Sequence, residues 1–346
     1  MGDELYRLTV CPQGADNIRN SEGSVIETSD GHLLLVWWHF YAGEGADHSP
    51  GDIAARWSDD RGRTWGDLFI LQENVARQST CSPSLLRLQD GRIAFFYGLK
   101  HASTDLPFYV RLSSDEAQSW TEPVLVTTAP GYWVMNNDRA VQLSTGRVVA
   151  PVCWIDDCYE PGNNRCHSTV FYSDDHCATW TRSEGWLTVE DAAGYQEPGV
   201  VELTDGRVMM FGRTTLGHPY RAYSDDWCET WYGLEPMHNV DAPCSPVCIK
   251  RIPATGDLLM VWNDNADTTK NHQARRTPLT MALSRDEGET WERIKNVEAD
   301  PAHAHGYTSI AFLDDEVLLT YYDSTALTIG DCSLKLCIAP LSWVYA

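Results

Sequence analysis

The sequence carries little positive charge. Its 346 residues include 26 Lys and Arg against 49 Asp and Glu, which gives a formal net charge of −23 at pH 7. A chain this acidic is repelled by phosphate backbones and by anionic lipid, so neither nucleic acid nor a membrane surface is expected as a partner. A site for an anionic ligand must therefore be local and built from a few well-placed cations.

Several other patterns are missing. No apolar run is long enough to span a membrane, and residues 1–6 lack the basic segment and apolar stretch of a signal peptide. The 11 cysteines contain no Cys-x-x-Cys pair, which argues against a zinc site of that type. We expect a cytoplasmic protein with reduced, mostly buried thiols and no cofactor.

One short pattern occurs five times. It reads Ser-x-Asp-x-(Gly)-x-Thr-Trp, and successive copies start about 50 to 60 residues apart, a period typical of propellers and other arrays. Ser and Asp side chains can bond the backbone of a tight turn, Gly tolerates positive φ, and Trp packs between sheets. The copies are 58–65, 113–120, 173–180, 224–231 and 284–291.

This pattern resembles the Asp-box of sialidase-type β-propellers. A second repeat precedes each box and reads as an apolar strand, a turn that is often Asp-Gly or Thr-Gly, and another apolar strand. Six copies predict an all-β, six-bladed propeller of four-stranded antiparallel sheets, with residues 1–346 as one domain. The copies are 24–37, 84–97, 140–150, 199–211, 247–262 and 309–321.

The sixth blade has no box after its hairpin. Its third strand is predicted at 333–340, close to the end of the chain, whereas residues 5–10 form an apolar strand that has no neighbour of its own. We therefore predict that residues 5–10 supply the outer strand of the sixth blade. Pairing of this kind closes the ring and removes open sheet edges.

Individual residues extend the resemblance to sialidases. The segment Gln-Glu-Pro-Gly around Glu197, continuing to Arg213, is similar to the segment that carries the acidic partner of the nucleophile and a carboxylate-binding arginine. Arg276 and Tyr307 lie in segments that resemble those of a second such arginine and of the nucleophilic tyrosine. Asp47 lies in a long loop where sialidases keep their acid/base aspartate. The resemblance implies an exo-glycosidase that acts on sialic acid or a related acidic sugar, with a glycan or glycoside as substrate.

The chemistry implied by the resemblance is coherent. A sialic acid carries a carboxylate on its anomeric carbon and would repel a carboxylate nucleophile, so a neutral tyrosine suits it better. In the implied retaining mechanism Glu197 accepts the proton of Tyr307, which attacks the anomeric carbon. Asp47 protonates the leaving oxygen and then activates water, while arginines hold the substrate carboxylate in bidentate fashion.

The first blade departs from the sialidase pattern. Sialidases open it with Arg-Ile-Pro, and the position of that arginine falls at Ser21, beside Glu22. The chain has thus lost an arginine and gained an acid. In one interpretation another arginine compensates, the candidates being Arg19, Arg77 and Arg139. In the other, Glu22 pairs with Arg213 or Arg276, which predicts weak activity on simple sialosides because two carboxylates in one site repel.

Other residues also fall where strands begin or end at the predicted channel mouth. These substrate-binding candidates are Asn137, His39 and Asp323. His39, His303 and His305 could suggest a metal, but paired histidines near a strand more often pack as polar side chains, and no metal is expected. Three alternatives stay open: a glycosidase for another sugar, a polysaccharide lyase on the same scaffold, and a non-catalytic glycan-binding propeller.

Overall fold

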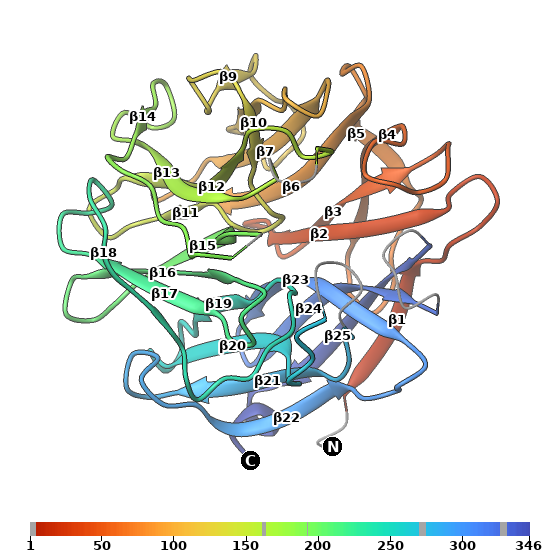
Figure 1. Ribbon diagram of the computed structural model, residues 1–346. Helices are drawn as coiled ribbons and strands as arrows, with labels where there is room; N and C mark the ends of the chain where they lie inside the picture. The colour runs from red at the N-terminus through yellow and green to blue at the C-terminus, as the bar shows by residue number, and fades with distance from the viewer. Residues whose placement is uncertain (1–4, 161–163, 192, 270–274, 326–330) are drawn as a thin grey trace.

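The computed structural model describes residues 5–160, 164–191, 193–269, 275–325 and 331–346. Its strands form six antiparallel sheets, which follow one another around a ring (Figure 1). Each sheet is one blade, and the strands of each blade are named below from the innermost outward. The six-bladed, all-β architecture predicted from the repeats is therefore confirmed.

The first three blades run in chain order. Blade 1 contains β2 (Arg19–Glu27), β3 (Leu33–Phe40), β4 (Gly51–Ser58) and β5 (Phe69–Gln72). Blade 2 contains β6 (Ser79–Arg87), β7 (Ile93–Lys100), β8 (Phe108–Ser113) and β9 (Val124–Leu125). Blade 3 contains β10 (Tyr132–Val134), β11 (Val141–Gln142), β12 (Val148–Ile155), β13 (His167–Ser173) and β14 (Thr181–Arg182).

The last three blades complete the ring. Blade 4 contains β15 (Gln196–Glu202), β16 (Val208–Arg213), β17 (Tyr220–Ser224) and β18 (Tyr232–Pro236). Blade 5 contains β19 (Cys248–Arg251), β20 (Leu258–Asn263), β21 (Leu279–Ser284) and β22 (Glu292–Glu298). Blade 6 contains β23 (Ala304–Leu313), β24 (Glu316–Ser324), β25 (Ser333–Pro340) and β1 (Tyr6–Cys11), after which the helix α1 (Leu341–Tyr345) follows.

The N-terminal strand closes the ring, as predicted. β1 pairs antiparallel with β25 from Tyr6 opposite Ile338 to Cys11 opposite Leu334. Figure 1 shows the red N-terminal strand among the blue strands of the last blade. Apolar side chains of blades 1 and 6 pack together beside this seam, among them Leu33, Trp37 and Leu336. Within the described ranges, no helix has the length and apolar character needed to cross a membrane.

The five Asp-boxes form the turns that their residue types predict. In the last box the Ser284 hydroxyl accepts the N–H of Gly288 at 2.8 Å, and Asp286 accepts the N–H and hydroxyl of Thr290 at 2.8 and 2.6 Å. The residue at the glycine position has positive φ even where it is Cys177 or Cys228, at 72° and 77°. The side-chain bonds of the box therefore hold a turn that cysteine alone would disfavour.

The inner strands carry bulges that direct side chains toward the ring centre. In β2, β6, β15 and β23 the pairing with the next strand shifts register near the start of the strand. The bulge residues Glu22, Ser82, Glu197 and Tyr307 have φ of 57°, 51°, 47° and 54°. Positive φ at non-glycine residues is costly and often marks functional sites. Bulges re-aim side chains, and all four of these residues line one pocket.

Blade 3 differs from the predicted pattern. Its inner strand was expected to begin at Ala140, but it is divided into β10 and β11, with an irregular segment from 135 to 140 between them. Asp138 in this segment also has positive φ, at 57°. The interruption lets the polar run of residues 136–138 face the ring interior, where a regular strand would direct alternate residues into the sheet interfaces.

Candidate active site

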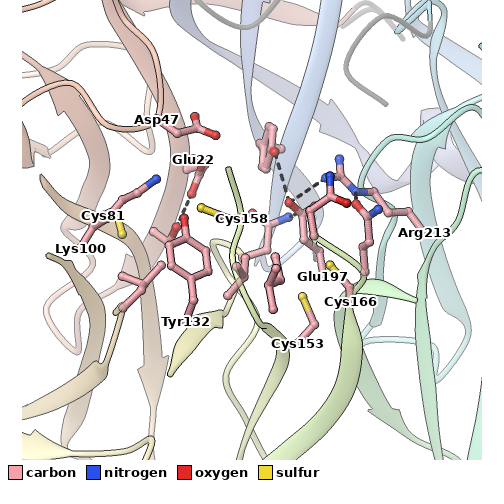
Figure 2. A pocket seen from close by; sticks show the side chains of 18 of the residues that line it. Glu22, Asp47, Cys81, Lys100, Tyr132, Cys153, Cys158, Cys166, Glu197 and Arg213 are labelled. Carbon is pink, nitrogen blue, oxygen red and sulfur yellow. Dashed lines mark hydrogen bonds and ion pairs between the residues drawn. The ribbon is translucent and has the colours of Figure 1, made fainter. Parts of the chain in front are cut away.

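The four bulge residues meet in a cavity of about 250 Å³. Side chains from blades 1, 2, 3, 4 and 6 form its walls, and Figure 2 shows the acidic, basic and thiol groups that face one another across it. We call this cavity the pocket. Its polar lining includes Glu22, Asp47, Ser82, Lys100, Tyr132, Asn136, Tyr159, Gln196, Glu197, Arg213 and Tyr307.

Tyr307 and Glu197 are in direct contact, although 110 residues separate them in the chain. The Tyr307 hydroxyl donates to Oε1 of Glu197 at 3.2 Å, and both side chains are buried. Burial raises the pKa of Tyr307 well above its usual range, and the Glu197 carboxylate raises that pKa further. The resting hydroxyl is therefore neutral, with a carboxylate in place to accept its proton.

Arg213 completes this group. Its Nη2 lies 3.1 Å from Oε1 of Glu197, and its Nε donates to the side-chain oxygen of Gln196 at 3.0 Å (Figure 2). Its Nη1 is buried and has no hydrogen-bond partner within the described part of the chain. A buried donor without a partner is costly, and this one belongs to a residue that lines the pocket. Its N–H groups are thus suited to bind an anionic ligand.

Arg276 lies behind Tyr307. Its guanidinium carbon is 5.5 Å from the centre of the Tyr307 ring, and its Nη1 donates to the Tyr322 hydroxyl at 3.3 Å. Burial lowers the pKa of Arg276, but the neighbouring Tyr322 and Tyr307 raise it. The net effect is a raised pKa. Two of the predicted arginines therefore stand beside the predicted nucleophile, although Arg276 does not belong to the described lining of the pocket.

Arg19 and Asp47 form a short ion pair at the opposite side of the pocket. Nη1 of Arg19 lies 2.6 Å from Oδ1 of Asp47 and also donates to the Gly45 carbonyl at 2.9 Å. The guanidinium is buried and lies 4.5 Å from the ring centre of Phe40. Among the three arginines predicted to compensate for the lost one, Arg19 is thus the one that reaches a pocket residue in the described structure.

Glu22 lines the pocket but does not pair with Arg213 or Arg276, contrary to one of the two interpretations of the sequence. Its Oε2 accepts the Ser82 hydroxyl at 2.6 Å, and its Oε1 is 3.9 Å from Nη2 of Arg19. The bulge in β2 turns the carboxyl group toward blade 2, away from the arginines of blades 4 and 5. Burial raises the pKa of Glu22 to about 7, against the opposing effect of Arg19.

Three other predicted residues lie outside the described lining of the pocket. Arg77 is exposed. Arg139 is buried and donates from Nη2 to the Val247 carbonyl at 2.7 Å. His39 contacts Asp52, its cross-strand neighbour in blade 1, at 2.9 Å between Nδ1 and Oδ1. The side chains of Arg139 and His39 are thus engaged by their own surroundings.

Asn137 and Asp323 also lie outside that lining. Asn137 donates from Nδ2 to the carbonyls of Gly23 at 2.6 Å and Tyr307 at 3.1 Å, and thereby ties blade 3 to blades 1 and 6. Asp323 accepts a hydrogen bond from His303 at 2.7 Å. Asn137 therefore holds the main chain of the predicted nucleophile through its carbonyl, while Asp323 of β24 pairs with a histidine outside the pocket lining.

Several lining residues were not among the predicted site residues. The Lys100 ammonium lies 5.3 Å from the ring centre of Tyr132 and 5.2 Å from that of Tyr159. Lys100 is the last residue of β7, just as Arg213 is the last residue of β16. This position could have indicated from the sequence that Lys100 belongs to the site. Tyr132 and Tyr159 lie outside the hairpin repeat and offered none. Four thiols also face the pocket, those of Cys81, Cys153, Cys158 and Cys166.

Comparison with known proteins agrees with this architecture. The profile of a family described as "BNR repeat-like domain" matches residues 22–319, which is most of the chain. The chain belongs to this family. Its similarity to curated sialidases also confirms the resemblance to the sialidase superfamily. It is 29% identical to a sialidase of Paraclostridium sordellii over 238 residues, covering 61% of this chain and 56% of that protein.

A second curated relative matches over a longer range. The chain is 25% identical to a sialidase of Micromonospora viridifaciens over 343 residues, covering 89% of this chain and 50% of that protein. The chain thus spans about half the length of both relatives. Among solved structures, the Hadza microbial sialidase Hz136 superimposes with a TM-score of 0.79 at 18% identity, over 97% of this chain and 68% of that one.

Another solved structure matches from end to end. A protein of unknown function from Dyadobacter fermentans gives a TM-score of 0.76 at 19% identity and covers 97% of this chain and 99% of its own. At such identities the likeness establishes the propeller fold alone.

Proposed function

We propose that this protein is a retaining exo-glycosidase of the sialidase type, which removes a terminal acidic sugar from a glycan, with sialic acid as the leading candidate. One observation carries the proposal. Oε1 of Glu197 is in contact with both the Tyr307 hydroxyl and the Arg213 guanidinium, in a buried wall of the pocket. The curated relatives named sialidases support the same reaction class.

The residues can carry out the first chemical step as follows. Tyr307 Oη attacks the anomeric carbon and passes its proton to Glu197, so that negative charge does not accumulate on the tyrosine. Arg213 beside Glu197 keeps that carboxylate close to the hydroxyl. The bond to the leaving oxygen breaks as the Tyr307–sugar bond forms, and a carboxylic acid of the opposite wall gives that oxygen a proton. Water later gives a proton to the same carboxylate and displaces the tyrosine with net retention.

Recognition of an acidic sugar rests on the cations beside Tyr307. Nη1 of Arg213 offers donors that no described residue uses, and Arg276 adds a second buried guanidinium next to the tyrosine. Guanidinium groups bind carboxylates in bidentate fashion. Because Glu22 bonds to Ser82, it does not pair with either arginine. A cavity of about 250 Å³ suits a single sugar better than a chain.

A panel of chromogenic glycosides, with sialosides beside uronides and neutral hexosides, tests the proposal. We expect turnover of an acidic glycoside, and product analysis then separates hydrolysis from the unsaturated sugar that a lyase would release. Tyr307→Phe removes only the hydroxyl and should lower kcat by more than about a thousandfold while the melting temperature stays within a few degrees. Binding without turnover on the whole panel would instead support a lectin-like propeller.

A further inference from the structure

A second carboxyl group faces the reaction space and is not named in the steps given above. Glu22 occupies the same bulge position in β2 that Glu197 occupies in β15 and Tyr307 in β23, so the three side chains project from the same level of the ring. Figure 2 shows Glu22 across the pocket from Glu197 and Arg213, below Asp47. A sugar bound between these walls would have Tyr307 on one side and Glu22 on the other.

The two carboxyl groups on this side have different environments. Asp47 accepts a charge-assisted bond from Arg19 at 2.6 Å, and its side chain is 48% exposed. Glu22 is 5% exposed and its nearest Arg19 nitrogen is 3.9 Å away, beyond hydrogen-bonding distance. Ser82 bonds only one of its two oxygens within the described structure. Glu22 is thus the more deeply buried of the two and lies farther from the Arg19 guanidinium, and burial favours the protonated form of a carboxyl group.

We infer that Glu22, and not Asp47, is the acid/base residue of the glycosidase reaction; this inference rests on the function proposed above. In the first step the Glu22 carboxyl proton passes to the glycosidic oxygen as its bond to the anomeric carbon breaks and the bond to Tyr307 forms. In the second step the Glu22 carboxylate takes a proton from water, whose oxygen displaces Tyr307, and Glu197 returns the proton to the tyrosine. Asp47 and Arg19 form the wall that holds the leaving group.

The surroundings of Glu22 agree with this role. Burial is the main cause that raises its pKa to about 7, the negative groups Asp47 and Glu197 act in the same direction, and Arg19 and the Ser82 bond oppose them. A carboxyl group with this pKa is partly protonated at neutral pH, as a residue that alternates between acid and base requires. The ionisable groups around it are Arg19, Asp47, Cys81, Glu197, Tyr307 and Cys332.

The test compares Glu22→Gln with Asp47→Asn on two glycosides of the sugar that the panel identifies. One has phenol as a poor leaving group, and the other has 4-nitrophenol, which needs little protonation. We expect Glu22→Gln to lower kcat/KM about 100- to 1,000-fold on the phenyl glycoside and less than about tenfold on the nitrophenyl glycoside. Sodium azide should then speed turnover, because it attacks the glycosyl-enzyme without a base. Asp47→Asn should affect both substrates by a similar factor.

Each other outcome overturns the inference. If Asp47→Asn shows the dependence on leaving group and the azide rescue, Asp47 is the acid/base residue. Suppose that the wild type turns over a glycoside, that Tyr307→Phe abolishes this turnover, and that Glu22→Gln lowers kcat/KM equally on both substrates. The glycosidase proposal then survives and this inference alone fails. If the wild type hydrolyses nothing on the panel, both fail. Should Glu22→Gln not fold, the wild-type profile decides: kcat/KM must fall as pH rises through about 7.

Discussion

At the scale of single residues, the pocket contains side chains whose pKa is raised above that of the free amino acid. Burial and Glu197 raise the pKa of Tyr307, so its hydroxyl needs a base before it can attack, and burial raises the pKa of Glu22 to about 7. Such shifts cluster where chemistry takes place, although structural ion pairs produce them too. Their effect on stability is a separate, measurable consequence.

The first prediction concerns the dependence of stability on pH at Glu22. Its pKa is about 7 in the folded protein against 4.5 for the free side chain, so the folded state binds more protons between these values. The free energy of unfolding therefore falls as pH rises from about 4.5 to about 7.5, by up to about 3 kcal/mol from this group. Glu22→Gln should lack this component. Denaturant titrations of both proteins at several pH values measure it, and parallel pH curves would contradict it.

A second residue prediction concerns Asn137, which donates to the Tyr307 carbonyl from another blade. Asn137→Ala should lower kcat at least tenfold through misplacement of Tyr307, with little change in the preference between phenyl and nitrophenyl glycosides. The variant should also unfold more readily by about 1–3 kcal/mol, because two buried carbonyls lose their donor. A variant with normal kcat would show that the tyrosine is positioned by the bulge alone.

At the scale of elements, the Asp-boxes stabilise turns and the bulges place side chains in the pocket. The boxes fix turns by local bonds, such as the three to Ser284 and Asp286, whereas the bulges supply the pocket with Glu22, Glu197 and Tyr307. The turns were predictable because their residues are adjacent in the chain. The partners of Glu22 were not, because Ser82 reaches it from another blade and the bulge decides the direction of the carboxyl group.

Because the boxes stabilise turns and do not contribute to the pocket, a third prediction follows for the Asp-box. Asp286→Ala removes the acceptor of two bonds to Thr290 and should destabilise the protein by roughly 1.5–3 kcal/mol without changing kcat/KM by more than about twofold. Asp67→Ala, at an exposed position outside the boxes, is the matched control and should change neither quantity. Calorimetry and kinetics on both variants measure the effect, and a large loss of activity from Asp286→Ala would contradict this prediction.

At the scale of the whole molecule, the sequence predicted the ring and its closure but not all the walls of the pocket. Six hairpins and one spare strand sufficed to pair Tyr6 with the region of Ile338. Matched segments sufficed to bring Tyr307 and Glu197 together. Lys100 was not chosen as a site residue although its position at the end of β7 indicated it, whereas Tyr132, which lies beside it, falls outside the hairpin repeat.

Ring closure gives a fourth prediction. Deleting residues 1–11 removes β1, exposes the edge of β25 and uncovers the apolar seam between blades 1 and 6. We expect a melting temperature lower by more than about 10 °C and a tendency to aggregate through the open edge. Deletion of residues 1–4 alone, which leaves β1 intact, is the control. A truncated protein as stable as the control would mean that the ring does not depend on this strand.

The central claim is that Tyr307 forms a covalent bond with the sugar, and one measurement tests it directly. The protein is treated with a fluorinated sialic acid or, if the panel selects another sugar, with its fluorinated glycosyl fluoride, and is then digested for peptide mass spectrometry. The account predicts one added sugar on Tyr307 in the wild type and none in Tyr307→Phe. A label on Glu22, Asp47 or Glu197, or enzymatic turnover with no covalent label at all, would contradict it.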